Sequence, residues 1–360
     1  MIGTVNNESQ IDYLLQLSLG CANDSETLLP DLTKADTQEK AKFLSLANSH
    51  HVVMRALNPL RERAQNVGNV EIADWCDEAL SRERAMIANS LKFLADICQK
   101  LESAGIQITV IKSLDHWPDL GNDLDLYTPS HQEEVSRVMR QSVAAQLKYR
   151  TWGDRLAHKC NFGVQGLAKS VEIHHGCLGQ TGEHIALARR FYTRRIPQRI
   201  AEYTFMIPAP EERIIAATLQ RMYRHFYIRV CDIVNTHAIL ESGNLDFAEL
   251  RSAADTGGIW PGVATYLRIV TEYVRFFRGT AYELPSEVLA ASRFGKNQVF
   301  VRGVWLRVPV RRAARLYGRQ VCQMANRRDL YGLLRLSLLP PLASAARLSY
   351  MLTGNPSGIW

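Results

Sequence analysis

The first hundred residues carry apolar side chains at helical spacing. Between Asp74 and Leu101 the apolar positions recur three, four or seven residues apart, which brings them to one face of an α-helix. Gly105 then provides a helix stop. A second helix is predicted over residues 41–60. It ends near Pro59 or continues beyond it after a kink, because proline removes a backbone donor. These patterns predict an N-terminal helical region at residues 1–104.

Short alternating segments replace the helical pattern in the next part of the chain and predict the strands of a sheet. Residues 106–111 are rich in β-branched side chains, and the following strand is expected to carry Asp123 and Asp125. Residues 156–164 and 169–174 are expected to pair as a hairpin. The alternation in these segments predicts a sheet with one polar face and one buried face.

A helix is predicted between the second strand and the hairpin, over residues 131–146. Ser130 is expected to be its N-cap, with Glu133 completing a capping box. Strand, turn, strand, helix and hairpin together predict a mixed α/β core at residues 105–207. The expected fold class is therefore α+β, a small mixed sheet with flanking helices between two helical regions.

The C-terminal half returns to helical patterns. Residues 208–290 are predicted to form a helical domain, interrupted at Gly243 and at Gly257-Gly258. Within a C-terminal extension at residues 291–360, residues 297–310 are expected to be extended and 311–324 to form a cationic amphipathic helix.

Composition favours an ordinary globular protein. The chain has 360 residues, of which 46% are hydrophobic and 22% charged. Seven scattered cysteines form no CxxC pair, so a disulfide framework and a structural zinc site are not expected. No signal peptide and no transmembrane segment are predicted, and the expected location is the cytoplasm.

The positive charge belongs to the C-terminal extension. Residues 291–360 contain twelve Lys or Arg and one acid, a net +11, so the other residues contribute −4 to the overall +7. The arginines are interleaved with Phe300, Trp305 and Tyr317, a pattern that suits RNA or another polyanion. The Leu-rich stretch from Tyr331 could instead rest on an anionic membrane surface. The simplest alternative is a solvated helix face, or packing against the helical domain.

Two strands carry the candidate chemistry. Asp123 and Asp125 alternate with leucines and should share one strand face, and Glu172 and His174 should do the same. If the two strands are neighbours, three carboxylates converge. Such a cluster repels itself unless cations neutralise it, so it predicts a divalent metal site for phosphoryl or nucleotidyl transfer.

These motifs resemble those of the polymerase-β-like nucleotidyltransferase superfamily. A strand ends in Ile111-Lys112-Ser113, nine residues follow, then Asp123-Leu124-Asp125, and a later strand carries Glu172-Ile173-His174. More narrowly, the chain is similar to a family of uncharacterised bacterial nucleotidyltransferases that carry Leu-Lys-Gly, Asp-Ile-Asp and acid-x-His at these places. The resemblance covers roughly residues 10–245 and leaves the C-terminal extension outside it.

The resemblance implies Mg²⁺-dependent transfer of an NMP from an NTP such as ATP to an acceptor hydroxyl on a small molecule, a protein or RNA. Asp123 and Asp125 would hold two Mg²⁺ ions. Glu172 would complete the second ion's shell and accept the hydroxyl proton. These three residues are the expected catalytic and metal-binding groups.

The same resemblance implies the residues that hold the nucleotide. Backbone N–H groups around Ser113 would grip the terminal phosphates. Lys112 would neutralise charge on the departing pyrophosphate. His174 is the third expected nucleotide-binding residue, although it and His175 could equally be metal-adjacent groups or histidines that close a strand end.

The chain departs from the family at two points. Ser113 replaces the family's glycine, and Gly121-Asn122 stands where an arginine is common. These departures keep open an alternative, an inactive nucleotidyltransferase-fold adaptor or a polyanion-binding protein. Two further residues are assigned provisionally: His158 faces the cleft only if the hairpin register permits, and Asp232 is expected to pair with Arg229 or Arg224.

Overall fold

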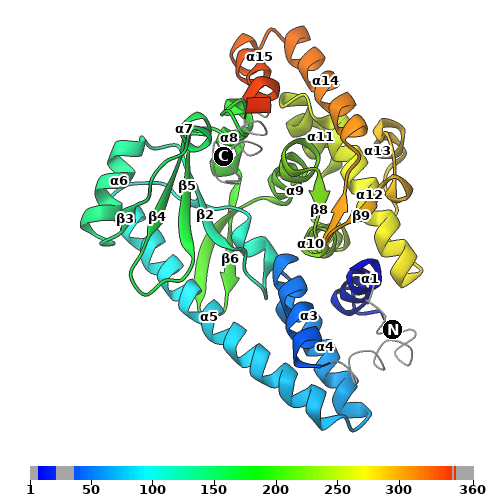
Figure 1. The fold of residues 1–360 in the computed structure, drawn as a ribbon. Helices are drawn as coiled ribbons and strands as arrows, with labels where there is room; N and C mark the ends of the chain where they lie inside the picture. Colours follow the sequence, from blue (N-terminus) through cyan, green and yellow to red (C-terminus); the bar gives the residue numbers. More distant parts are fainter. Residues whose placement is uncertain (1–6, 22–35, 343, 346–360) are drawn as a thin grey trace.

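The computed structural model describes residues 7–21, 36–342 and 344–345. Its N-terminal part is helical, as predicted. The helices are α1 (Asn7–Ser18), α3 (Thr37–Ser49), α4 (Val53–Asn66) and α5 (Val70–Ser103). The long α5 helix runs past α3 and α4 and continues along the sheet (Figure 1). Its apolar stripe is buried, as its spacing predicted.

For the helix predicted over 41–60, the predicted position of the break is wrong. The chain breaks between α3 and α4, whereas Pro59 lies inside α4. His50 explains the break, because its ring holds two distant backbone groups. Its Nδ1 accepts from the Val230 amide at 3.0 Å, and its Nε2 lies 2.7 Å from the Val304 carbonyl. Tertiary hydrogen bonds therefore outweigh the local proline signal.

A mixed sheet of five strands lies beside these helices (Figure 1). Its spatial order is β1-β2-β5-β4-β3, in which β2 and β5 are parallel and the other neighbours are antiparallel. The α+β class and the predicted hairpin, β4 with β5, are confirmed. The strand expected at 106–111 is reduced to two residues. The bounds are β1 (Thr109–Val110), β2 (Asp123–Thr128), β3 (Gln146–Leu147), β4 (Lys159–Gly163) and β5 (Ser170–His175).

The helix predicted over 131–146 is shorter than expected and is capped differently. Helix α6 spans Gln132–Gln141, and its N-cap residue, His131, makes no side-chain capping bond. The amide of Ser130 instead donates to Thr128 Oγ1 at 3.2 Å, which holds Ser130 in the preceding turn. The chain leaves the helix after Gln141, and the last residue of the predicted helix, Gln146, begins β3 and pairs with Gly163 of β4.

Several short elements connect the strands to one another and to the second helical region. They are the 3₁₀ turn η1 (Ser113–His116), α7 (Trp152–Leu156), α8 (Ile185–Thr193) and the hairpin β6 (Arg195–Ile200) with β7 (Tyr203–Pro208). The helical region follows with α9 (Pro210–Thr218), the π-helix η2 (Leu219–His225), α10 (Val230–Glu241), α11 (Phe247–Thr256), α12 (Trp260–Arg278) and α13 (Ser286–Ala291).

The C-terminal extension is built into this helical region. After the turn η3 (Lys296–Gln298) it forms the hairpin β9 (Phe300–Arg302) with β10 (Trp305–Arg307), then α14 (Val310–Asn326) and α15 (Leu330–Ser337). Strand β10 pairs with β8 (Tyr227–Ile228), and Leu306 and Leu316 are buried in the shared core. The predicted extended stretch and cationic helix are thus confirmed. None of the helices in the described part of the chain has the length and apolar content needed to cross a bilayer.

Candidate metal centre

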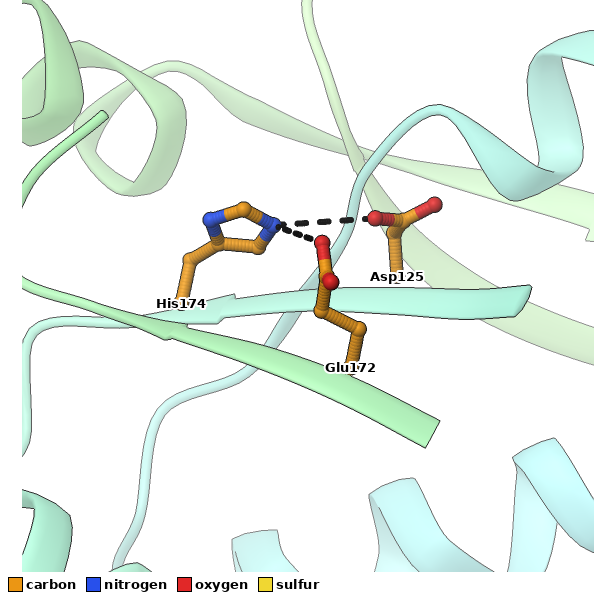
Figure 2. Close-up of side chains that lie close together, drawn as sticks. All are labelled: Asp125, Glu172 and His174. Atoms are coloured by element: carbon orange, nitrogen blue, oxygen red, sulfur yellow. Dashed lines mark ion pairs between the residues drawn. The ribbon is translucent and has the colours of Figure 1, made fainter. Parts of the chain in front are cut away.

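Two parallel strands bring the candidate ligands together. Strands β2 and β5 pair with Asp125 opposite Glu172 and Tyr127 opposite His174. The side chains of Asp125, Glu172 and His174 point toward one another (Figure 2), and one donor atom from each lies within 4.8 Å of the others. His174 Nε2 is 2.9 Å from Glu172 Oε1 and 3.6 Å from Asp125 Oδ1. The cluster offers two carboxylates and one imidazole.

The aliphatic residues that alternate with these ligands anchor them from the opposite face. Leu124, Leu126, Val171 and Ile173 are all fully buried in one core cluster. Burying each such side chain contributes roughly 1.5–3 kcal/mol. A shift of one residue in either strand would expose this layer, so packing holds the two acids in register.

Asp123 lies on the same sheet face but does not join the cluster. Its Oδ1 accepts a hydrogen bond from Ser170 Oγ at 2.5 Å. It precedes Asp125 by two residues, and two residues span roughly 7 Å along a strand. Both aspartates nevertheless line one cavity, together with Glu172. Among the described residues, the close group is therefore two acids with a histidine, and Asp123 stands at its edge.

Two lysines neutralise the cluster. Lys112 Nζ is 2.5 Å from Asp125 Oδ1 and 3.9 Å from Glu172 Oε1. Lys159 Nζ is 2.7 Å from Glu172 Oε2 and 3.2 Å from Asp154 Oδ1. Burial by itself raises the pKa of Glu172. The hydrogen bond and charge of His174, with the charges of the two lysines, outweigh burial and hold that pKa well below its usual value.

Lys159 is a site residue that sequence reasoning missed. In the β4–β5 hairpin it lies opposite His174, which puts its side chain on the same face as the acids. His158, expected at the cleft, precedes β4 in a turn, with a positive φ of 49°, and is exposed. It is not among the residues that line the cavity of the acids. Given the hairpin register, the alternation of strand residues would have identified Lys159.

The turn after β1 places Lys112 over the acids. Lys112 has a positive φ of 62°. Ser113 Oγ ties the turn to β2, because it accepts from the Asp125 amide at 2.7 Å and donates to the Asp123 carbonyl at 3.1 Å. The Ser113 amide itself donates to the Ile111 carbonyl at 2.6 Å. Ser113 is therefore a small buried residue whose polar groups position the lysine and the aspartate strand.

A cationic wall faces the acids across a cavity of about 250 Å³. It comes from η2 and the start of α10 and consists of Arg221, Arg224 and Arg229, with the uncharged His225 among them. Burial, followed by the positive charges of Arg224 and Arg221, lowers the pKa of His225 to about 2. Arg224 has no carboxylate within 4.0 Å among the residues that the structure describes. The closely spaced arginines at 221, 224 and 229 were the sequence signal for this wall, which sequence reasoning did not use.

The other two arginines of the wall are held in place by neighbours. Arg221 Nε lies 2.6 Å from Asp232 Oδ2, and the same oxygen accepts from the Arg229 amide at 2.7 Å. The Arg229 guanidinium lies over the rings of Tyr227 and Trp305, at 5.7 and 5.5 Å from their centroids. Asp232 is thus a structural partner, as expected, although the side chain it pairs with is that of Arg221.

His175 belongs to the opposite face of the sheet. Its Nδ1 lies 3.3 Å from the Ser130 carbonyl, and burial lowers its pKa to about 4. His174 alone faces the acids. Its second nitrogen, Nδ1, is buried and has no hydrogen-bond partner in the described part of the chain. Two interpretations were left open for these histidines. The position of His174 fits a group beside the metal, and that of His175 fits a histidine that closes a strand end.

The donor set fits a divalent cation. Two carboxylates and a neutral imidazole are ligands for Mn²⁺, Zn²⁺ or Fe²⁺ as well as for Mg²⁺, which prefers oxygen. A cation would need Asp125 and Glu172, which Lys112 and Lys159 now neutralise. Asp125, Glu172 and His174 can therefore hold a metal, in competition with the cluster's own lysines.

Comparisons with known proteins add one finding. No protein-family model and no curated protein matches the chain. Among solved structures, the chain is similar to an antigenic nucleotidyltransferase-like protein from Paracoccidioides brasiliensis, with 15% sequence identity and a TM-score of 0.32. The similarity covers 49% of this chain and 92% of that one.

Proposed function

We propose that the protein is a metal-dependent nucleotidyltransferase that moves an NMP from an NTP to an acceptor hydroxyl. In this reaction the acceptor oxygen forms a bond to the α-phosphorus. The bond from the α-phosphorus to the oxygen that bridges to the β-phosphorus breaks, and pyrophosphate leaves. A bound divalent cation would supply charge neutralisation and lower the pKa of the acceptor hydroxyl.

One observation supports this proposal: the acids of the cluster, which His174 adjoins, line the same cavity as three arginines. Acids alone fit a cation, and arginines alone fit an anion. A polyphosphate chelated to a divalent cation needs both, on opposite sides. Arg224, which has no acidic partner among the described residues, would bind a phosphate oxygen.

The remaining roles follow from position. Asp125, Glu172 and His174 would hold the cation, and Asp123 would complete its surroundings when the nucleotide binds. Within the cluster, Glu172 would also take the proton of the acceptor hydroxyl. Lys112 would turn from Asp125 to the pyrophosphate as charge develops there. The backbone around Ser113 would contact the terminal phosphates.

Calorimetric titration tests the proposal. We expect each NTP to bind only in the presence of Mg²⁺ or Mn²⁺, and the Asp123→Asn/Asp125→Asn variant to lose this metal dependence. A matched control is Asp77→Asn/Asp96→Asn, which removes the same charge from exposed acids of α5. Nucleotide binding that is absent, or independent of metal and unchanged in the site variant, would contradict the proposal.

An inactive adaptor is the second candidate, and the lysines favour it. The charges of Lys112 and Lys159 already neutralise Asp125 and Glu172 without a metal ion. A site that has lost its metal would need such buried counter-charges. This candidate predicts no metal-dependent nucleotide binding in either the native protein or a Lys112→Met variant. The acceptor of an active enzyme would be identified by incubating cell extract with the metal and labelled NTPs, and then characterising the labelled product.

The exposed arginines of the C-terminal extension support an additional interaction with a polyanion. Arg311, Arg315 and Arg319 follow one another at four-residue intervals along α14 and are all exposed. This spacing places them on one helix face. In the described part of the chain, no carboxylate lies within 4.0 Å of any of them. RNA is the polyanion we propose for this face.

A further inference from the structure

A second cavity adjoins the metal centre and is closed by the C-terminal extension. It is mainly apolar, and side chains from four parts of the chain line it. The core contributes Ile111, α8 contributes Phe191 and η2 contributes Tyr223. The C-terminal helices contribute Tyr317, Gln320 and Leu339. We call it the α14–α15 pocket.

The C-terminal helices are firmly docked where they form this wall. Arg335 Nη1 donates to the Thr181 carbonyl at 2.6 Å and to the Leu156 carbonyl at 3.1 Å. Thr181 Oγ1 returns a bond to the Arg335 carbonyl at 2.9 Å, and Tyr317 Oη donates to the Leu336 carbonyl at 2.7 Å. These bonds attach α15 to the loop that follows β5, to the end of α7 and to α14, so the pocket wall is fixed relative to the sheet.

The two cavities adjoin. Lys112, Gln220 and Arg224 line both, and His174 also lines the α14–α15 pocket. A ligand with an anionic end and an uncharged end would pass these side chains to reach from one cavity into the other. Its anionic end would lie between the acids and the arginines, and its uncharged end among the aromatic and aliphatic side chains.

Three described lining residues of the α14–α15 pocket have a buried polar atom without a hydrogen-bond partner: His174 Nδ1, Tyr223 Oη and Gln320 Oε1. Gln320 is the one of the three that lies on the C-terminal helices. Gln320 is 1% exposed. Its Nε2 lies 3.2 Å from His184 Nε2, and its Oε1 is buried without a hydrogen-bond partner among the described residues. A buried acceptor of this kind is stabilised by a ligand that brings a donor. With the amide nitrogen bonded to His184, the oxygen is the group available to such a ligand.

We propose that the α14–α15 pocket takes the base of the NTP, and that an exocyclic amino group of this base donates to Gln320 Oε1. The inference rests on the proposed nucleotidyltransferase function and adds the nucleotide class, a base with an amino group such as adenine or cytosine. A flat ring suits a pocket lined by Phe191, Tyr223 and Tyr317. It also gives the C-terminal extension a role in specificity.

Matched nucleotides test the assignment. ATP and ITP differ at the position of the amino group, which ITP replaces by an oxygen that cannot donate. In the presence of Mn²⁺ we expect the intact protein to bind ATP about tenfold more tightly than ITP, the scale expected for a buried hydrogen bond. The Gln320→Met variant should bind the two equally. Gln323→Met, on the same helix but outside the lining, should keep the preference.

A second variant covers the case in which Gln320→Met fails to fold. Leu339 is half-buried and lines the pocket. Leu339→Trp should lower the affinity for ATP at least tenfold and leave the affinity for inorganic triphosphate unchanged. Equal binding of ATP and ITP to the native protein, or ATP binding that Leu339→Trp does not change, would overturn the inference but leave the proposed function standing. If no nucleotide binds in the presence of metal, both the inference and the proposed function are wrong.

Discussion

Lys112 Nζ lies 2.5 Å from Asp125 Oδ1, so a lysine ammonium holds the carboxylate that a divalent cation would need. The two cations compete for one acceptor. Removing the lysine leaves Asp125 free and deprives the nucleotide of a positive charge. The same residue therefore opposes metal binding and favours polyphosphate binding.

We predict opposite effects of Lys112→Met on these two ligands. Affinity for Mn²⁺ alone should rise about tenfold, because removing one opposing charge at this distance is worth about 1.4 kcal/mol or more. Affinity for the metal–NTP complex should fall. Calorimetric titration measures both, and Lys100→Met serves as the control, since Lys100 pairs with Asp96 on α5. A fall in both affinities would show that Lys112 only holds the site together.

Arg221 and Arg224 should separate stability from binding. Arg221 is 3% exposed and paired with Asp232, and breaking a buried pair costs about 3–5 kcal/mol. Arg221→Ala should therefore lower the free energy of unfolding by that amount in urea titrations. Arg224→Ala should change stability by less than about 0.5 kcal/mol and weaken NTP binding about tenfold. Equal losses of stability in the two variants would contradict the phosphate role of Arg224.

His50 should make stability depend on pH. Burial lowers the pKa of His50 to about 4, below its usual 6.5; the backbone bond to Val304 opposes this shift, and the charge of Arg229 adds to it. Its Nδ1 accepts from the Val230 amide, so a proton on this nitrogen would face a donor. Between these pKa values the unfolded chain binds the proton and the folded chain does not. The contribution of neutral His50 is therefore present above pH 6.5 and lost as pH falls toward 4.

The measurement is the free energy of unfolding of the native protein and of His50→Gln at pH 7.5 and at pH 4.5. We expect His50→Gln to be less stable than the native protein at pH 7.5, and the difference to shrink by about 2–3 kcal/mol at pH 4.5. Other buried histidines titrate in both proteins and cancel. A difference that stays constant between the two pH values would show that His50 does not titrate as described.

The arginine face of α14 should bind RNA electrostatically. In the Arg311→Gln/Arg315→Gln/Arg319→Gln variant, affinity for a single-stranded RNA oligonucleotide should fall, and the slope of log affinity against log salt should decrease by about 2, since each lost phosphate contact removes roughly 0.7. The Arg→Lys variant at the same positions keeps the charge and should keep the slope. Fluorescence anisotropy at several salt concentrations measures the slope. An unchanged slope in the Gln variant would exclude this face as the RNA-binding site.

The alternation of Asp123, Asp125, Glu172 and His174 with aliphatic residues determined from the sequence alone that these side chains share one sheet face, because the strand period is two. The same periodicities located α5, α14 and the β4–β5 hairpin. Helix boundaries were less predictable, since His50 bonds to a backbone group far along the chain and Ser130 is held in the preceding turn by Thr128.

Only the tertiary structure decided which groups surround the acids. The parallel pairing of β2 and β5 brings Asp125, Glu172 and His174 together, and the hairpin register adds Lys159. Arg224 and Gln320 reach the site from η2 and α14, about fifty and one hundred and fifty residues beyond the metal strands. Such contacts depend on how helices dock against the sheet. That docking depends on close packing among many side chains from distant parts of the chain. No local sequence pattern predicts it.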